Sequence, residues 1–277
     1  MTILELLLPA FLASLILTGI HAYLGVHVVE RGVIFVDLAL AQIAGLGTTV
    51  AYLMGYDLHS STAYLVSLLF TFVGAAIFAA THVYRRTRIP QEAIIGIVYA
   101  VSAAVAILVM SKATQETEHL KEMLVGNILS VSSAELVKTA LLYALVGIFH
   151  YAFRKRFLLI SMNEVEAEKQ GINIRFWDFL FYMSFGFVVT SSVAIAGVLL
   201  VFCFLIVPAV TAMLFTERLG PRLAIGWTMG ALVSAGGVTL SFLMDLPTGA
   251  TIVATFGGAL LLLAALRLVF RRGAAAA

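Results

Sequence analysis

Long apolar stretches with almost no charge recur along the whole chain, and this recurrence limits what the chain can fold into. A hydrocarbon core about 30 Å thick requires roughly 20 apolar residues per helix. Stretches of about that length run over residues Ile3–Val26, Val33–Gly55, Thr62–His82, Ala93–Ser111, Ser133–Phe153, Phe176–Ala194, Ala196–Phe215, Leu223–Leu243 and Gly249–Val269. We predict an all-α, polytopic bundle of about nine transmembrane helices. The sixth and seventh stretches run together near Ala194–Gly197, so eight spans is the alternative.

Composition excludes a soluble fold. Charged residues make up 12% of the chain, against about 25% in a typical soluble domain. We therefore expect one transmembrane domain over residues 1–277, surrounded by membrane lipid. The net charge of +2 gives no reason to expect a nucleic-acid partner.

The distribution of Lys and Arg predicts an orientation, because cytoplasmic loops carry an excess of these residues. With nine spans, 14 of the 17 basic residues fall on one side, and Lys112, Lys121 and Lys138 fall on the other. The basic side holds Arg31, Arg85, Arg86, Arg88, Arg154, Lys155, Arg156, Lys169, Arg175, Arg218, Arg222, Arg267, Arg271 and Arg272. We expect the N-terminus outside and the C-terminus in the cytoplasm.

Sequence motifs for nucleotide binding and hydrolysis are missing. The chain contains no Gly-x-x-x-x-Gly-Lys-Ser/Thr phosphate loop, no Gly-x-Ser-x-Gly and no His-Glu-x-x-His. We therefore expect a chain that is not an enzyme and binds no cofactor. If it moves a solute uphill, the energy comes from a partner subunit or from an ion gradient.

The longest cytoplasmic loop, residues 154–175, contains a segment with helix signals over about 161–172. Ser161 or Asn163 can cap the N-terminus, acidic residues follow, and Gly171 suits the C-terminal cap. We predict a short amphipathic helix at the inner surface, with the small residue Ala167 in its middle. Such a helix can dock in a groove of another protein, although a plain capped connector has the same sequence pattern.

Four segments, in order along the chain, resemble one family of transporters. They are Gln91–Tyr99 (QEAIIGIVY), Leu124–Val131 (LVGNILSV), residues 196–212 with AGVLLV and LIVPAVTA, and Ser241 with Asp245–Gly249 (DLPTG). Together they are similar to the permease subunit of ATP-binding-cassette (ABC) importers for zinc, manganese and related metal ions.

The resemblance implies a fold, partners and a location. It implies a type II ABC importer permease that acts as a homodimer in the plasma membrane of a prokaryote. An ABC ATPase subunit would use the ATP, and an extracytoplasmic metal-binding protein would deliver the ion. The segment with Glu164, Ala167 and Gly171 would be the coupling helix that docks on the ATPase. The outer loop with Asp245 and Gly249 would contact the binding protein, although Asp245 also suits plain turn capping.

The second stretch departs from the family pattern of an Asp and a His four residues apart. The residue four after Asp37 is Ala41, and aligning the downstream residues instead puts Gln42 in the place of the histidine. A five-residue offset is roughly 140° off register on a helix, so Asp37 and Gln42 cannot both point at one ion. The departure leaves open which metal passes.

Other polar residues within or beside the spans are candidates for the substrate path. Asp37, about a turn from the cytoplasmic end, either lines a pore or lies at the interface near Arg31. His21 lies at a similar depth and is either a second metal ligand or a histidine hydrogen-bonded between helices. Glu92 begins the fourth span, where a carboxylate is favourable whether or not it acts in gating.

Close helix packing is indicated by Gly226 and Gly230, four residues apart in the eighth stretch. Packing within the chain is the simpler interpretation, and an interface with a second copy is the alternative.

Two other kinds of transporter remain open. One is an ABC permease for a metal chelate or a cobalamin-like substrate, whose members usually have ten spans. The other is a proton-coupled secondary transporter that uses Asp37 or His21 and needs no docking helix.

Overall fold

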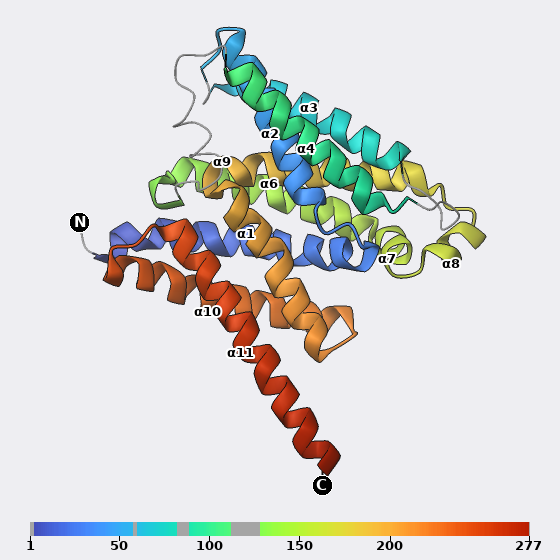
Figure 1. The fold of residues 1–277 in the computed structure, drawn as a ribbon, viewed down its shortest axis with the longest axis vertical. Coiled ribbons are helices and arrows are strands. Elements are labelled where there is room, and N and C mark those ends of the chain that lie inside the picture. Colours follow the sequence, from blue (N-terminus) through green and yellow to red (C-terminus); the bar gives the residue numbers. More distant parts are fainter. Residues whose placement is uncertain (1–2, 58–59, 82–88, 112–127, 277) are drawn as a thin grey trace. The chain divides into compact units, whose positions relative to one another are not determined.

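The helices of the chain follow the apolar stretches. The computed structural model describes residues 3–57, 60–81, 89–111 and 128–276, and within them every regular element is a helix. The long helices are α1 (Ile3–Arg31), α2 (Val36–Leu53), α3 (Ser61–Ala80), α4 (Gln91–Met110), α6 (Ser133–Ala152), α9 (Ile174–Phe215), α10 (Leu219–Met244) and α11 (Thr248–Ala276), and the short ones are η1 (Ile128–Ser130), α7 (Arg154–Met162) and α8 (Glu164–Lys169) (Figure 1).

Eight helices of the described residues are long and apolar enough to cross a membrane. One of them, α9, has 42 residues and consists of two helices that meet at a kink at Gly197, where φ is 75° and ψ is 161°. Residues 174–196 and 198–215 each have close to the roughly 20 residues that one crossing takes. The all-α bundle is therefore confirmed, and the alternatives of eight and nine spans differ only in how α9 is counted.

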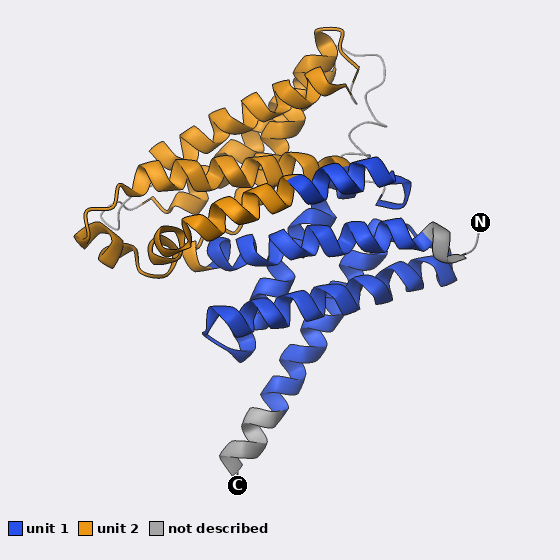
Figure 2. Cartoon of the chain, turned by 180° about the vertical axis from the view of Figure 1, so that it is seen from behind, with its two compact units in different colours: residues 1–29, 125–141, 195–277 blue, residues 30–124, 142–194 orange. Residues whose placement is uncertain are grey.

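The chain folds as two compact units, each built from segments distant in the sequence (Figure 2). Unit 1 contains residues 1–29, 125–141 and 195–277, and unit 2 contains residues 30–124 and 142–194. Three helices, α1, α6 and α9, contribute to both units. Asp37, Gln42, Glu92 and the loop with α7 and α8 belong to unit 2, whereas His21 and Asp245 belong to unit 1.

Hydrogen bonds between neighbouring helices hold unit 2 together. Ser67 Oγ of α3 donates to the Ala44 carbonyl of α2 at 2.8 Å. Thr71 of α3 and Thr190 of α9 share a hydrogen bond of 3.2 Å between their hydroxyls. Inter-helix bonds of this kind contribute roughly 0.6 kcal/mol each in a membrane. They fix α2, the helix that carries Asp37, against its neighbours.

Small residues bring the helices of unit 1 close together. A Cβ atom added to Gly230 of α10 would overlap the side chain of Thr18 in α1, and one added to Gly226 would touch Ala22. Trp227 Nε1 of α10 donates to the Gly19 carbonyl of α1 at 2.9 Å. Gly226 and Gly230 therefore pack within the chain, as the simpler of the two sequence interpretations predicted.

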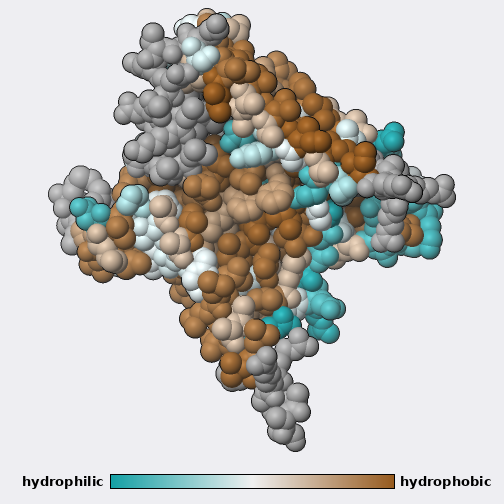
Figure 3. Space-filling model, in the orientation of Figure 1, coloured by the Kyte–Doolittle hydropathy of each residue, from teal (hydrophilic) through white to brown (hydrophobic). Residues whose placement is uncertain are grey.

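Apolar side chains point outward from many of the spans. Leu65, Leu108, Leu145, Leu232 and Leu261 are each more than 60% exposed. Figure 3 shows hydrophobic residues over most of the visible face and hydrophilic residues gathered over α7 and α8. Outward-facing leucines on helices of spanning length are what a lipid environment requires.

Candidate functional site

Asp37 is a fully buried carboxylate in the first turn of α2. Its side chain is 0% exposed, and neither carboxylate oxygen has a hydrogen-bond partner among the described residues. The Tyr143 hydroxyl of α6 lies within range of an electrostatic interaction with Asp37. A charged group inside a span costs about 3 kcal/mol or more unless it is paired. The N-terminal end of α2 offsets part of this cost, and a bound cation would offset the rest.

The interfacial alternative for Asp37, in which it reaches water or pairs with Arg31, is wrong. Asp37 is inaccessible to water, and Arg31 is already engaged elsewhere. Arg31 Nη1 donates to Asp178 Oδ1 of α9 at 2.6 Å. This pairing satisfies the charge of Arg31 and leaves Asp37 as the carboxylate whose charge the described residues do not balance.

Glu92 of α4 caps the N-terminal end of α2. Its Oε1 atom accepts a hydrogen bond of 3.0 Å from the backbone N–H of Phe35, the N-cap residue of α2. Its Oε2 atom is buried without a hydrogen-bond partner. Glu92 therefore ties α4 to the end of α2 that carries Asp37, a structural role that sequence reasoning had not assigned to it.

Gln42 does not share the environment of Asp37. Residues 36–53 form one continuous α-helix, in which Asp37 and Ala41 are both fully buried, whereas Gln42 is partly exposed. Positions four residues apart share a helix face and positions five apart do not. One turn on from Asp37, the same helix face therefore carries Ala41, which has no metal-binding atom.

His21 lies in α1 within unit 1, so its predicted partnership with Asp37 of unit 2 stays a prediction. The His21 ring is 0% exposed, and Nδ1 donates to the Leu17 carbonyl at 2.7 Å. In the neutral ring this hydrogen bond leaves the lone pair on Nε2, the form of imidazole that binds metal ions. Among the described residues, no three of the His, Cys, Asp and Glu side chains gather into a metal-binding group.

The loop over residues 154–175 contains two helices where the sequence predicted one. α7 occupies Arg154–Met162, and the predicted helix is shorter than 161–172, covering Glu164–Lys169 as α8. Ser161 belongs to α7, and Asn163 is the cap, accepting a hydrogen bond of 3.1 Å from the N–H of Glu166. Ser161 was one of two candidate caps, and its place is explained by the apolar run before it, which extends α7.

The end of α8 follows the predicted glycine signal. Gly171 has φ of 71°, its N–H donates to the Glu168 carbonyl at 2.9 Å, and the N–H of Ile172 donates to the Ala167 carbonyl at 3.1 Å. These two bonds form a Schellman cap, which requires the left-handed conformation that glycine adopts without strain.

Ala167 faces the interior of the chain. Its side chain is 0% exposed, whereas Val165 on the same helix is 40% exposed. The small residue therefore lets α8 pack closely within unit 2. A contact of α8 with another protein has to use its other side chains.

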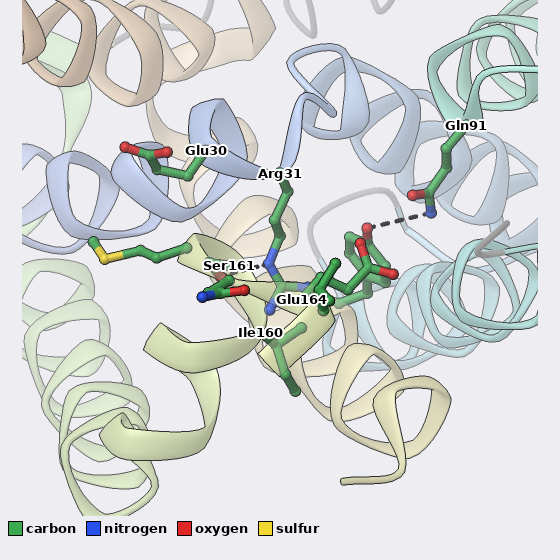
Figure 4. A pocket seen from close by; sticks show the side chains of 10 residues that line it. Glu30, Arg31, Gln91, Ile160, Ser161 and Glu164 are labelled. Carbon is green, nitrogen blue, oxygen red and sulfur yellow. Dashed lines mark hydrogen bonds between the residues drawn. The ribbon is translucent and has the colours of Figure 1, made fainter. Parts of the chain in front are cut away.

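A cavity of about 290 Å³ lies beside α7 and α8 in unit 2. It is lined by Glu30, Arg31, Gln91, Ile160, Ser161, Met162, Asn163, Glu164, Val165 and Tyr182. In Figure 4, Arg31 reaches from α1 toward Ser161 and Glu164, and Glu30 points away. Gln91 Nε2 donates to the Phe78 carbonyl at 3.1 Å. Glu164 of α8 is one of the residues that line this cavity.

Sequence reasoning missed the pair of Arg31 and Asp178. A signal was available, because Asp178 falls inside an apolar stretch where a charge requires a partner. Arg31, which ends α1, was expected at the cytoplasmic side.

The turn between α10 and α11, which the sequence predicted on the outer side, is held by its own hydrogen bonds. Asp245 is exposed at the C-cap of α10 with φ of 52°, and Gly249 lies in the first turn of α11. Ser241 Oγ donates to the Leu246 carbonyl at 2.6 Å and shares a bond of 2.7 Å with the Thr248 hydroxyl. Of the other family-like segments, residues 124–127 lie outside the described part of the chain.

Comparison with known proteins places this arrangement among transporters. The chain is 30% identical over 244 residues to the manganese transport system membrane protein MntC of Listeria innocua, covering 88% of this chain and 84% of that protein. It is 28% identical over 249 residues to a probable iron transport system membrane protein of Haemophilus influenzae, covering 90% and 89%.

A solved structure shares the fold. PsaBC from Streptococcus pneumoniae in complex with Fab superposes with a TM-score of 0.76 at 23% identity, covering 92% of this chain and 90% of that chain. The model of the ABC 3 transport family matches residues 3–267, nearly the whole length. The chain therefore belongs to the ABC 3 transport family, as its motifs predicted.

Proposed function

We propose that the chain is the membrane permease of an ATP-driven importer and that a divalent metal ion passes along Asp37. The observation that carries this proposal is a fully buried carboxylate on a helix of spanning length, for which the described part of the chain provides no hydrogen-bond partner. A passing cation is the partner that such a charge requires. The relatives named as manganese and iron transport proteins support the same substrate class.

The donor set favours manganese or ferrous iron over zinc. Carboxylate and amide oxygens suit Mn²⁺, whereas imidazole suits Zn²⁺. The helix face of Asp37 carries Ala41 one turn on, so α2 offers one carboxylate and no adjacent imidazole. One strong ligand on α2 also suits transport, because an ion that is held too firmly is not released.

Energy would come from a separate ATPase subunit that docks on α8. The capped helix at Glu164–Lys169, with exposed side chains at Val165 and Glu168, gives this subunit a rigid contact point. Closure of the ATPases around ATP would displace α8, and the displacement would open and close the path past Asp37 in turn.

The same proposal sets the orientation and the outer partners. α7 and α8, with exposed Arg154, Lys155 and Arg156, would face the cytoplasm, because basic loops remain inside. The N-terminus would then be outside, with the turn at Asp245 positioned to meet an extracytoplasmic metal-binding protein. Two copies of the chain would enclose the path.

A transport assay tests the proposal. The chain is reconstituted in proteoliposomes with an ABC ATPase subunit and a metal-binding protein from the same organism, and uptake of Mn²⁺ is measured with and without ATP. We expect uptake that requires ATP and is lost with Asp37→Ala. Uptake driven by a proton gradient without ATP would identify a secondary transporter, and uptake only of chelated metal would identify a chelate permease.

The docking contact is tested in the same preparation. Val165→Arg places a large charge on the exposed face of α8, and we expect it to abolish binding of the ATPase while the chain still folds. Ala167→Arg is unsuitable for this purpose, because Ala167 is fully buried and its replacement disturbs the fold itself. An ATPase that binds the Val165→Arg variant normally would contradict docking at α8.

A further inference from the structure

Arg31 joins three segments of unit 2 through one side chain. Its Nε atom donates to Ser161 Oγ of α7 at 2.7 Å, and its Nη1 atom donates to Asp178 Oδ1 of α9 at 2.6 Å. Its guanidinium lies over the ring of Phe181, 4.1 Å from the ring centre. With a side chain only 7% exposed, Arg31 is a rigid planar fork that holds α1, α7 and α9 in one geometry.

The contacts of Arg31 lie between α8, the proposed docking helix, and Asp37, the proposed ligand in the path. Ser161 is two residues before Asn163, the cap of α8, so the Arg31–Ser161 bond reaches the base of the docking helix. On the other side, Arg31 ends α1 only six residues before Asp37. The route from α8 to the start of α2 therefore runs through Ser161 and Arg31 and crosses no other transmembrane helix.

The start of α2 is braced against α4 as well. Glu92 accepts a hydrogen bond from the N–H of Phe35, four residues after Arg31, and its neighbour Gln91 donates to the Tyr182 hydroxyl of α9 at 3.4 Å. A displacement of the turn between α1 and α2 is therefore passed on to the start of α2 and to α4, instead of being absorbed by a loose loop.

We infer that Arg31 is a positioning residue that carries movement of α8, through Ser161, to the turn before Asp37. The inference rests on the proposed function, because it takes α8 as the docking helix and Asp37 as part of the path. Asp178 and Phe181 hold the guanidinium in place, and Ser161 passes the movement to it.

The chain offers a matched pair of serines for testing this role. Ser161 and Ser184 are both buried, at 7% and 5% exposure, and each is bonded to one buried nitrogen side chain. Ser184 Oγ shares a hydrogen bond of 2.8 Å with His150 Nε2 and donates to the backbone carbonyl of Phe181 at 2.8 Å. Ser161→Ala removes the link to Arg31, and Ser184→Ala removes a similar bond to a buried nitrogen without removing a bond to Arg31.

The experiment measures Mn²⁺ taken up per ATP hydrolysed in proteoliposomes that hold the complete importer. Ser161→Ala is expected to lower this ratio about tenfold, the effect of losing a hydrogen bond to a charged group. ATP hydrolysis and binding of the ATPase are expected to stay at wild-type values, and the melting temperature is expected to fall by no more than it does in Ser184→Ala. Ser184→Ala is expected to keep the wild-type ratio.

A second variant tests the fork itself. Arg31→Lys keeps the charge beside Asp178 but cannot bond to Asp178 and Ser161 in the same planar geometry, so the same fall in the ratio is expected. An unchanged ratio in Ser161→Ala, or an equal fall in Ser184→Ala, would overturn the inference. Wild-type protein without ATP-dependent Mn²⁺ uptake would instead contradict the proposed function, and the inference would fall with it.

Discussion

Among the residues that the structure describes in unit 2, two carboxylates lie fully buried, and their surroundings differ. Asp178 of α9 is 2.6 Å from Arg31, whereas neither oxygen of Asp37 in α2 has a hydrogen-bond partner in that part of the chain. Both side chains are 0% exposed. The fold balances the charge of Asp178, and under the proposed function the charge of Asp37 is left for the transported ion.

The positions of the two residues explain why one is paired. Asp178 lies where α1, α7 and α9 meet, so a cation from α1 can reach it and its ion pair joins these segments. Asp37 lies in the first turn of α2, where the helix dipole favours a negative charge without a fixed cation. A carboxylate stabilised only in part by a dipole is a better temporary ligand than one in an ion pair.

The largest expected effect is on the stability of the paired site. Asp178→Ala removes the partner of Arg31 and leaves a buried guanidinium with its charge unbalanced, so we expect a loss of about 3–5 kcal/mol. The measurement is the melting temperature in detergent and the yield of monodisperse protein. Melting at the wild-type temperature would mean that Arg31 is balanced by another group.

The unpaired site should respond in the opposite way. Asp37→Asn keeps the shape of the side chain and removes its charge, so we expect Mn²⁺ uptake to fall about hundredfold because the path loses its ligand. The melting temperature should stay the same or rise, because an unbalanced buried charge is removed. If Asp37→Asn destabilises the protein as strongly as Asp178→Ala, the contrast between the two sites fails.

A double substitution sharpens the interpretation of the ion pair. Arg31→Met together with Asp178→Met replaces the pair by apolar side chains, and we expect the stability to return to within about 1 kcal/mol of wild type. Transport per ATP should nevertheless stay low, because Ser161 has lost Arg31. Recovery of both stability and transport would show that the polar junction is needed only for packing.

The sequence predicted the helices well because spanning length and low charge leave few other structures. Gly171 likewise predicted the end of α8, because its cap is local and depends on one backbone conformation. The pairing of Arg31 with Asp178 was out of reach of local patterns, since the two residues are 147 positions apart. Counting Lys and Arg gave Arg31 a side of the membrane, and the partner that the sequence suggested for it was Asp37.

The burial of Ala167 was also beyond the sequence pattern. A small residue in a short helix suits a contact with another protein and a contact within the chain equally well. Only tertiary packing decides between them, and here α8 turns Ala167 inward. Asp37 was identified from the cost of a charge in a span. The sequence suggested Arg31 as its partner, and the structure pairs Arg31 with Asp178 instead.

The smallest expected effect concerns the residue after Ala41. Gln42→His adds an imidazole five positions from Asp37, on a partly exposed part of a regular helix. Because the two side chains diverge by roughly 140°, the ratio of Zn²⁺ to Mn²⁺ uptake should change by less than about twofold. Competition between the two ions in the proteoliposome assay measures this ratio. A strong gain in zinc uptake would mean that α2 departs from helical register during transport and brings position 42 to the ion, and Asp37 would then share its site with a second residue of its own helix.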